Sequence, residues 1–298
     1  MSAKNMVLKK DLKEKRELVN IAIDRFLPRK DEYPKQIHKA IRHTLFAGGK
    51  RLRPYLLINT YKLFKDDIDK TLMVAGAIEM LHTYTLIHDD LPEIDNDEYR
   101  RGKKACHVLF GSDIALLAGD ALLIYAFQAI ADASEVDEKL RLEFIKELSS
   151  DAGHSGLIGG QMIDIQSEGK KISKETLEYI HNNKTGKLIT LPIRFGCMLA
   201  EVPEEDLKRM ESFGQKIGLA FQIVDDILDI EGSIEDLGKT VGKDSKAKKA
   251  TFPAVYGLEK SRQMAEKLIV EAKALLEPYG ERAELLLMLC DFIHTRKF

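Results

Sequence analysis

The sequence predicts an all-α protein that forms a single domain over residues 1–298. Apolar residues recur at helical spacing along most of the chain, whereas the alternating pattern that is typical of β-strands is scarce. No stretch rich in Pro, Gly or Ser divides the sequence, which favours one domain. With 298 residues, of which 44% are hydrophobic, the chain is long enough to bury a large core.

The N-terminal half contains five predicted helices, which cover about residues 8–26, 34–48, 54 onwards, 71–90 and 113–131. Apolar residues in the first helix recur at helical spacing until Pro28 stops them. The second helix ends at Gly48 and Gly49, because a glycine is a common C-cap, and Pro54 opens the third. Ser112 is the expected N-cap of the fifth helix, since serine accepts hydrogen bonds from free backbone N–H groups.

The C-terminal half contains seven predicted helices, which cover about residues 137–151, 153–168, 174–183, 186–200, 204–230, 252–277 and 281–296. Pro192 is expected to kink the fourth of these, because a proline removes a backbone donor. The longest irregular stretch is GSIEDLGKTVGKDSKAKKA, at residues 232–250. Long loops without secondary structure are uncommon in compact domains and often act as lids or binding segments.

Composition excludes several classes of protein. The net charge of −2 argues against nucleic acid as a partner, because no excess of basic residues is present to neutralise a phosphate backbone. Three widely spaced cysteines indicate neither a disulfide framework nor a zinc site, and fit a reducing compartment. The N-terminus lacks the apolar core of a signal peptide, and no uninterrupted apolar run is long enough for a membrane span. We therefore expect a soluble cytoplasmic protein.

The stretch LHTYTLIHDDLPEIDNDEYRRGK, at residues 81–103, is the most informative part of the chain. An apolar helical run ends in Asp89 and Asp90, more carboxylates follow, and then come Arg100 and Arg101. Crowded carboxylates resist ionising side by side unless a cation lies among them, and their oxygen atoms suit Mg²⁺ that is shared with substrate phosphates. Arginine guanidinium groups bind phosphates in a forked geometry. For this cluster alone, a solvated charged turn is an equal alternative.

A second acidic cluster, FQIVDDILDIEG at residues 221–232, changes that balance. Asp225 and Asp229 are four positions apart, about 40° around a helix, so they share a face. Asp89 and Asp95 are six positions apart, which corresponds to about 240° around an ideal helix, so their side chains converge on one ion only if the backbone leaves the helix between them. Pro92 supplies that departure. Two acidic helix ends in one chain indicate a shared metal cluster.

Basic residues occur in two further stretches. GGKRLRP, at residues 48–54, places cations just after a helix end, where the glycines let them reach an anion; a basic turn is the alternative. The lysines of residues 232–250 are able to cover a phosphate, although a solvated loop is the more common use of such lysines. His82, two turns before Asp89, is able to donate to a diphosphate, and a core or surface histidine is an equal alternative.

These motifs together resemble those of trans-isoprenyl diphosphate synthases, and most closely the bacterial farnesyl diphosphate synthase type. The motifs are GGKRLRP, DDLPEID, RRGK, KTG at residues 184–186 and FQIVDDILD, in the order of the family. The resemblance implies an antiparallel helical bundle around a deep central cavity, and a homodimer. It also implies head-to-tail condensation of an allylic diphosphate with isopentenyl diphosphate. The departure from the family pattern is Asn96, where many relatives have Asp; it reduces local charge without removing an expected ligand.

The resemblance implies a role for each matching residue. Three Mg²⁺ ions are expected, two bound by Asp89 and Asp95 and a third by Asp225 with Asp229, while Asp90 and Asp226 lie in or near the same shell. The expected ligands of the allylic diphosphate are Arg100, Lys184, Gln222, Lys239 and Lys249, with Lys248 as the alternative to Lys249. The expected ligands of isopentenyl diphosphate are Lys50, Arg53, His82 and Arg101. Thr185 is expected to present its oxygen near the allylic carbon.

The length of the product is expected to depend on residues near the end of the helix that carries Asp89. Tyr84 lies about 7 Å further along this helix than Asp89, in the direction of the growing hydrocarbon tail. Helix geometry alone leaves Tyr84 or Thr85 as the floor of the cavity, and an aromatic that packs between helices is a further alternative. The resemblance favours Tyr84 and farnesyl diphosphate, the C15 product. A geranylgeranyl diphosphate synthase is the alternative within the family.

Two alternatives come from other classes of protein. A class I terpene cyclase also uses an Asp-rich motif and Mg²⁺, but it has no second diphosphate and so no use for Lys50, Arg53, His82 and Arg101. A non-catalytic helical partner subunit of a prenyl synthase is expected to lose one acidic cluster, whereas this chain has both.

Overall fold

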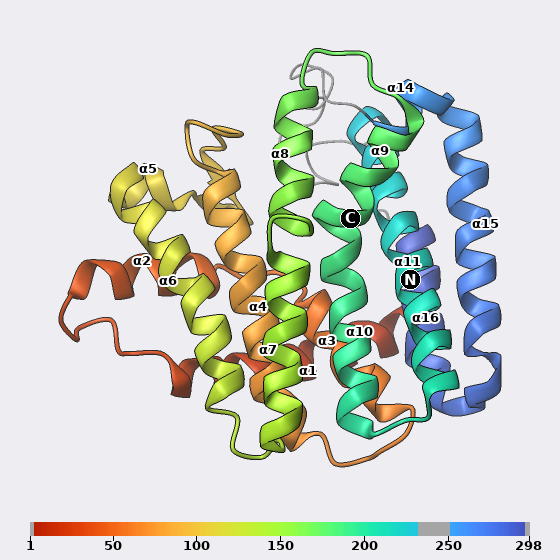
Figure 1. Cartoon of the computed structure of the whole chain (residues 1–298), viewed down its shortest axis with the longest axis horizontal. Helices are drawn as coiled ribbons and strands as arrows, with labels where there is room; N and C mark the ends of the chain where they lie inside the picture. Colours follow the sequence, from red (N-terminus) through yellow and green to blue (C-terminus); the bar gives the residue numbers. More distant parts are fainter. Residues whose placement is uncertain (1–2, 232–250, 296–298) are drawn as a thin grey trace. The chain divides into compact units, whose positions relative to one another are not determined.

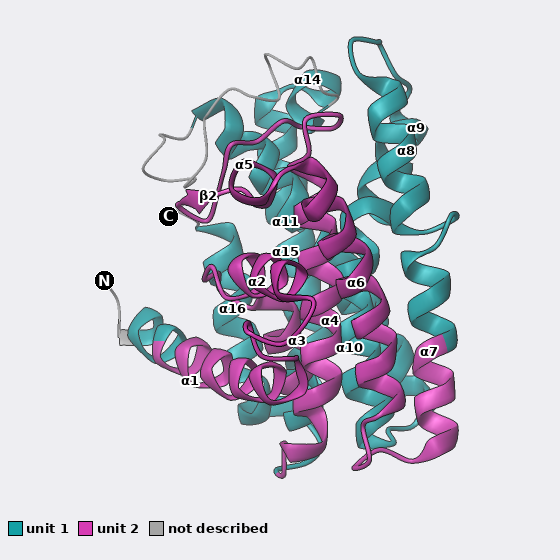
Figure 2. Cartoon of the chain, turned by 90° about the vertical axis from the view of Figure 1, so that its left-hand side faces the viewer, with its two compact units in different colours: residues 1–9, 59–66, 146–298 teal, residues 10–58, 67–145 magenta. Residues whose placement is uncertain are grey.

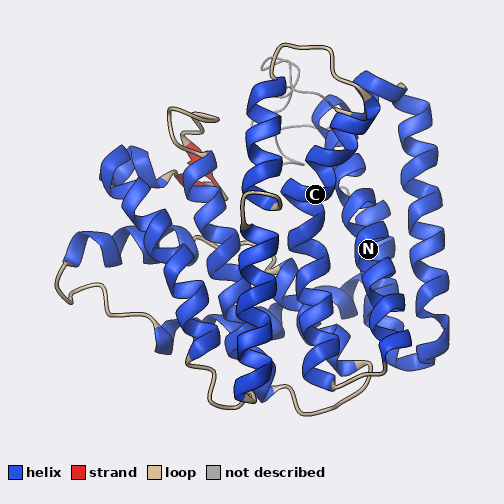
Figure 3. Cartoon of the chain, in the orientation of Figure 1, coloured by secondary structure: helices blue, strands red, loops and turns tan. Residues whose placement is uncertain are grey.

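Helices account for almost all regular structure in the computed structural model, which describes residues 3–231 and 251–295 (Figure 3). Within these residues the only strands are β1 (Tyr99–Arg100) and β2 (Lys103–Lys104). They form an antiparallel hairpin in which Arg100 pairs with Lys103. The predicted all-α class is therefore confirmed.

The chain forms two compact units, which Figure 2 colours separately. Unit 1 consists of residues 1–9, 59–66 and 146–298, and unit 2 of residues 10–58 and 67–145. Three of the four divisions fall inside helices, which are α1 (Ala3–Phe26), α3 (Leu52–Lys62) and α7 (Glu138–Ala152), and the fourth follows Asp66 in the segment after α3. The single domain that the sequence predicts stays a prediction.

In unit 2, helices α4 (Asp69–Asp89) and α6 (Ser112–Ala131) pack side by side (Figure 1). Helix α4 buries residues on all its faces, as the consecutive buried residues Val74, Ala75, Gly76 and Ala77 show, and this is typical of a core helix. A β-carbon on Gly119 of α6 would lie 2.1 Å from Nε2 of His88 on α4. The absence of a side chain at Gly119 therefore allows the close approach of the two helices. Two further helices, α2 (Lys35–Leu45) and α5 (Cys106–Phe110), pack against α6.

Unit 1 is built around α11 (Glu204–Glu231), which packs against α10 (Lys187–Ala200), α15 (Leu258–Leu276) and α16 (Glu284–His294). Buried side chains of Leu177, Ile223 and Phe252 form part of its core. The remaining elements of this unit are α8 (Leu157–Ser167), α9 (Lys174–Ile180), the π-helix η1 (His181–Gly186), α14 (Phe252–Tyr256) and the 3₁₀-helix η2 (Glu277–Ala283).

Several details differ from the sequence predictions. Ser112 is the first residue of α6 and not its N-cap, which is Gly111, with a φ of 91°. The predicted helix at 252–277 is two helices, because Gly257 adopts a φ of 84° between α14 and α15. The last predicted helix begins as the 3₁₀-helix η2, and α16 follows from Glu284. Pro192 lies inside α10, and the kink expected there stays a prediction.

Among the described residues one helix, α6, is long and apolar enough to cross a membrane by length and composition, with a mean hydropathy of 1.9. Core helices of soluble proteins pass the same test, so one such helix is weak evidence for a span. Ala115, Ala118 and Leu122 of α6 are buried in unit 2, and Asp120 interrupts its apolar run.

Candidate active site

The chain reverses direction directly after α4, and this turn brings Asp89 and Asp95 together. Helix α4 ends at Asp89, and Asp90 is its C-cap. The backbone N–H of Asp95 donates to the carbonyl oxygen of Asp89 at 2.9 Å, and that of Asp97 donates to the carbonyl of Asp90 at 3.2 Å. The predicted departure from the helix between Asp89 and Asp95 is confirmed. Their main chains are hydrogen bonded although six residues separate them.

Arg100 is held beside this turn by the buried carboxylate of Asp90. Its Nε donates to the two carboxylate oxygens of Asp90 at 2.9 and 3.2 Å, and its Nη2 lies 3.3 Å from Oδ2 of Asp97. Burial lowers the pKa of Arg100, but the hydrogen bond and charge of Asp90, with the charges of Asp89 and Asp95, raise it overall. Burial raises the pKa of Asp90 against the opposing effect of Arg100. Arg100 thus remains a cation near a group of carboxylates.

A second cationic group surrounds His82 on α4. Burial lowers the pKa of His82 well below its usual value, and the charges of Arg53, Arg101, Arg51 and Arg100 lower it further. His82 is therefore neutral near pH 7. Its buried Nδ1 has no hydrogen-bond partner among residues 3–231 and 251–295. Four cations whose charges act on a neutral imidazole favour the binding of an anion such as a diphosphate.

Two arginines of this group, Arg51 and Arg101, are fixed by Glu79 of α4, which is not among the residues predicted from the sequence. Its Oε1 lies 2.7 Å from Nη1 of Arg51 and 3.3 Å from Nη2 of Arg101. One signal in the sequence could have identified it: Glu79 is the one carboxylate in the apolar run from Thr71 to Ile87. A buried carboxylate requires a partner.

The two candidate chain-length residues lie on α4. Tyr84 is 4% exposed, and its ring contacts that of His88 edge to face at 5.5 Å. Its hydroxyl group is buried and has no hydrogen-bond partner within the described part of the chain. Burial and the charge of Asp89 raise the pKa of Tyr84 to about 12. Thr85 is partly buried, and its hydroxyl donates to the carbonyl oxygen of His82 at 2.8 Å.

In unit 1 the predicted residues Lys184 and Thr185 lie in the π-helix η1. Nζ of Lys184 pairs with Oδ2 of Asp164 on α8 at 2.5 Å. A β-carbon on Gly160 of α8 would lie 2.4 Å from the backbone nitrogen of Lys184, so α8 and η1 are closely packed. Single π-turns often occur at functional sites.

A chain of hydrogen bonds links η1 to α11 and α14. The hydroxyl of Thr185 donates to Oε1 of Gln222 at 2.9 Å, and Nε2 of Gln222 donates to Oδ1 of Asp226 at 2.8 Å. The other carboxylate oxygen of Asp226 accepts from the backbone N–H of Phe252 at 2.9 Å. The structure thus joins Thr185 and Gln222, two predicted ligands, through Asp226 to the start of α14.

The second acidic pair lies on the last turns of α11. Asp225 and Asp229 belong to one uninterrupted helix, so their predicted common face is confirmed. Asp225 is partly exposed and Asp229 is 3% exposed.

The donor set fits Mg²⁺, because each acidic group offers carboxylate oxygens. Within the residues that the structure describes, no three His, Cys, Asp or Glu side chains are gathered in the way that a metal site built from protein ligands alone requires. Mg²⁺ usually takes one or two protein carboxylates and completes its shell with substrate phosphates and water. The pairs Asp89 with Asp95 and Asp225 with Asp229 correspond to that pattern. Two other predicted ligands, Lys239 and Lys249, lie outside the described residues.

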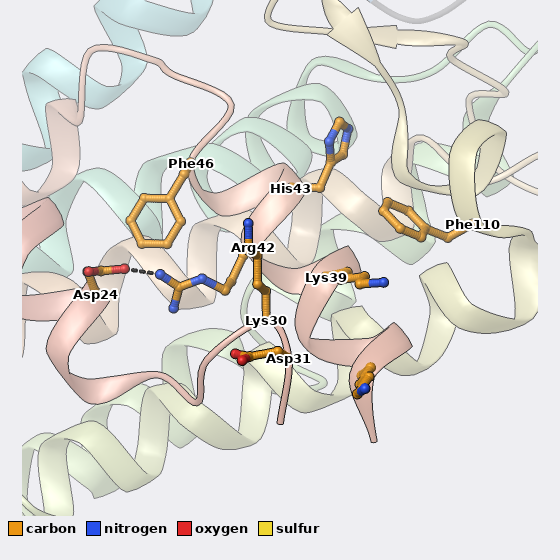
Figure 4. A pocket seen from close by; sticks show the side chains of 9 residues that line it. Asp24, Lys30, Asp31, Lys39, Arg42, His43, Phe46 and Phe110 are labelled. Carbon is orange, nitrogen blue, oxygen red and sulfur yellow. Dashed lines mark hydrogen bonds and ion pairs between the residues drawn. The ribbon is translucent and has the colours of Figure 1, made fainter. Parts of the chain in front are cut away.

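A separate hollow of about 780 Å³ in unit 2 is lined by residues of α1, α2, α5 and the segment that joins α1 to α2 (Figure 4). Its walls include the rings of His43, Phe46 and Phe110, and the guanidinium of Arg42 pairs with Asp24 and lies over the ring of Phe46. None of the site residues that the sequence predicts lines this hollow.

Comparison with known proteins gives consistent matches. Residues 34–280 match the polyprenyl synthetase family. A geranylgeranyl diphosphate synthase from Cyanophora paradoxa is 45% identical over 96% of this chain and 95% of its own length. A farnesyl diphosphate synthase from Geobacillus stearothermophilus is 41% identical over 96% of both chains. A solved geranyltransferase from Helicobacter pylori, complexed with magnesium and isoprenyl diphosphate, is 32% identical, with a TM-score of 0.82 over 96% of this chain and 97% of its own.

Proposed function

Because this chain belongs to the polyprenyl synthetase family of head-to-tail trans-prenyltransferases, we propose that it condenses isopentenyl diphosphate with dimethylallyl or geranyl diphosphate. The observation that carries the proposal is the turn after α4. There Asp89 and Asp95 meet through a backbone hydrogen bond, and Asp90 holds Arg100 beside them. Carboxylates for Mg²⁺ and a guanidinium for phosphate are the groups that an allylic diphosphate requires.

The residues divide the work of the reaction as follows. Asp89 and Asp95 would hold two Mg²⁺ ions, and Asp225 with Asp229 would hold a third. When bound, these ions stabilise the negative charge that grows on the leaving diphosphate. Arg100 adds positive charge to the leaving group, which eases the break of the allylic carbon–oxygen bond. Lys184 of unit 1 is a further proposed cation for an allylic diphosphate. Thr185 presents its oxygen near the resulting carbocation, fixed by its hydrogen bond to Gln222.

The second substrate is bound by the cations around His82. Lys50, Arg53, His82 and Arg101 hold isopentenyl diphosphate so that its double bond attacks the allylic carbocation. The released diphosphate is the base that takes the proton lost afterwards. A terpene cyclase has no second diphosphate, so the four arginine charges that act on His82 favour the synthase over this alternative.

We propose farnesyl diphosphate as the main product. The named relatives include both a farnesyl and a geranylgeranyl diphosphate synthase at similar identity, so overall similarity does not choose between C15 and C20. The buried aromatic ring of Tyr84, which lies five residues before Asp89 on α4, supports the shorter product. A geranylgeranyl diphosphate synthase is the alternative.

We also propose a cytoplasmic homodimer. Helix α6 exposes Leu116, Leu117 and Ile124, which are 46%, 57% and 65% exposed. Large apolar side chains gathered on one exposed helix are typical of an interface. Sedimentation of the purified protein tests this assignment, and a monomer at micromolar concentration would contradict it.

The direct test of the function is condensation by the purified protein. Incubation with Mg²⁺, geranyl diphosphate and labelled isopentenyl diphosphate should give a labelled prenyl diphosphate. Asp89→Ala and Asp225→Ala should each lower turnover by orders of magnitude with unchanged helical circular dichroism, because each removes a carboxylate ligand of Mg²⁺. Asp132→Ala, which changes an exposed carboxylate after α6, is the control. Near-normal turnover in either site variant contradicts the three-ion proposal, and a wild-type protein without turnover favours the non-catalytic partner subunit.

A further inference from the structure

Glu79 is a fully buried carboxylate that no step of the proposed reaction uses. It lies on α4, is 1% exposed, and precedes His82 by three residues. Its Oε1 accepts a hydrogen bond from Nη1 of Arg51 at 2.7 Å and one from Nη2 of Arg101 at 3.3 Å. A single oxygen atom therefore joins the turn at residues 48–53 to the turn that follows β1.

Both arginines are also fixed by the main chain of unit 2. Arg51, which is 3% exposed, donates to the carbonyl oxygen of Leu45 and, through Nε, to Oδ1 of Asn20 at 3.1 Å. Arg101 donates through Nη1 to the carbonyl oxygen of Gly48 at 2.9 Å. With Glu79, these bonds leave the Arg101 guanidinium little freedom to move.

The backbone is shaped for this contact. Arg51 and Arg101 both have a φ of 53°, which is uncommon for residues other than glycine. Gly49, with a φ of 100°, lies directly against Arg101: a β-carbon there would be 2.6 Å from Cζ of the guanidinium. The position of Arg101 thus depends on a residue without a side chain and on two unusual backbone conformations. Such conformations persist where the surrounding structure requires them.

The negative charge of Glu79 also stabilises the two guanidinium groups beside each other. Glu79 neutralises one of the two guanidinium charges that it contacts, so the group retains a net positive charge for an anion. Burial lowers the pKa of Arg101, and the charge of Glu79 opposes that effect. Without the carboxylate, Arg51 and Arg101 would repel each other at close range in a buried environment. The guanidinium of Arg101 would then move toward solvent.

We propose that Glu79 is a positioning residue for the second diphosphate. It does not touch the substrate, but it holds Arg101 against the segment that carries Lys50 and leads into α3, where Arg53 lies, so that these cations converge on isopentenyl diphosphate. The inference rests on the proposed function. It extends that function by giving a buried carboxylate on α4 control over the affinity for only one of the two substrates.

Glu79→Gln tests the proposal, because glutamine has nearly the same shape without the charge. The Michaelis constant for isopentenyl diphosphate should rise at least tenfold, while that for geranyl diphosphate should stay within twofold of wild type. Calorimetric titration with isopentenyl diphosphate alone should show the same loss of affinity without turnover. Equal changes in both Michaelis constants, or an unchanged constant for isopentenyl diphosphate, overturn the proposal.

A double-mutant cycle shows whether Glu79 acts through Arg101. In the background of Arg101→Gln, the change Glu79→Gln should raise the Michaelis constant for isopentenyl diphosphate by less than twofold, because the group that Glu79 positions is already lost. Full multiplication of the two effects overturns the proposal. If wild type does not consume isopentenyl diphosphate, the proposed function fails instead, so the two failures are distinct.

A second variant covers the case in which Glu79→Gln does not fold. The change leaves Arg51 buried without its carboxylate, and such a loss destabilises proteins. The double variant Glu79→Gln with Arg51→Gln removes both buried charges. It should fold and should still show the raised Michaelis constant for isopentenyl diphosphate, since Arg101 still lacks its anchor. A double variant with the wild-type constant would show that Glu79 serves only to neutralise Arg51.

Discussion

Truncation of Tyr84 should lengthen the product, since this ring is the proposed floor of the hydrocarbon cavity. Tyr84 lies five residues before Asp89, which places it about 7 Å closer to the N-terminal end of α4. Tyr84→Ala removes an aromatic ring that is 4% exposed. If that space continues the channel of the hydrocarbon tail, a further isoprene unit enters it. We expect the main product to change from C15 to C20 or longer.

The same substitution carries a cost in stability. Replacement of a buried aromatic residue by alanine lowers the free energy of unfolding by about 3–5 kcal/mol. The variant must therefore be assayed well below its melting temperature. Products made from geranyl diphosphate and labelled isopentenyl diphosphate are dephosphorylated and separated by chain length, and circular dichroism checks the fold.

Two matched variants separate the bulk of Tyr84 from its chemistry. Tyr84→Phe keeps the ring and removes a hydroxyl that has no hydrogen-bond partner among the described residues, so product length and stability should not change. Thr85→Ala tests the other residue that helix geometry allows as the floor, and should leave the product at C15. A folded, active Tyr84→Ala variant that still stops at C15 refutes the assignment. A wild-type protein that makes mainly C20 refutes the proposal of farnesyl diphosphate.

Two further predictions concern the arginine pair and a buried histidine. In steady-state assays, Arg101→Gln should mainly raise the Michaelis constant for isopentenyl diphosphate, and Arg100→Gln that for the allylic diphosphate, each by at least tenfold. The reason is that Glu79 holds the guanidinium of Arg101, whereas Asp90 holds that of Arg100. Equal effects of each variant on both constants would contradict this prediction. Burial lowers the pKa of His181 to about 4, while the unfolded value is about 6.5. The unfolded chain then binds more protons between these values, so the free energy of unfolding should fall by about 2 kcal/mol on going from pH 7 to pH 5. Urea titrations in EDTA at both pH values measure this change. His181→Phe should remove the contribution of His181 to the pH dependence. The variant keeps an aromatic ring against Phe252, on which His181 stacks with the ring centroids 5.0 Å apart.

Helices with strong periodicity could be predicted closely from the sequence. The predicted helices at 71–90 and 204–230 are α4 (Asp69–Asp89) and α11 (Glu204–Glu231). Both carry long apolar runs that end at acidic pairs, so local spacing determines them. The break at Gly257 was missed, because a single glycine with a positive φ in a helical pattern leaves no periodic signal.

Contacts between distant residues could not be predicted in the same way. The hairpin of β1 and β2 has only two residues in each strand, too few for an alternating pattern. The ion pair of Asp164 with Lys184 could not be predicted, because the two residues lie twenty positions apart. The hydrogen bond from the hydroxyl of Thr185 to Gln222 joins residues that are thirty-seven positions apart. Local periodicity contains no information on which of several polar residues meet in the folded chain.

The expectation that Arg100 and Arg101 bind different substrates stays a prediction, and the structure changes the geometry on which it rests. Two neighbouring residues on a helical turn diverge by about 100°. In the structure neither lies on a helix: Arg100 ends β1, and Arg101 follows in a turn with a φ of 53°. Asp90, the C-cap of α4, holds the guanidinium of Arg100, and Glu79 of α4 holds that of Arg101.

Those two carboxylates determine how far apart the guanidinium groups are held. Asp90 and Glu79 are eleven residues apart, which corresponds to about 16 Å of helix axis. Arg100 contacts the first and Arg101 the second. Because the anchors lie on one rigid helix, a ligand of Arg100 and a ligand of Arg101 occupy separate positions along α4. A mixed phenotype of the two arginine variants would therefore require α4 itself to shift, which the buried packing of its apolar residues opposes.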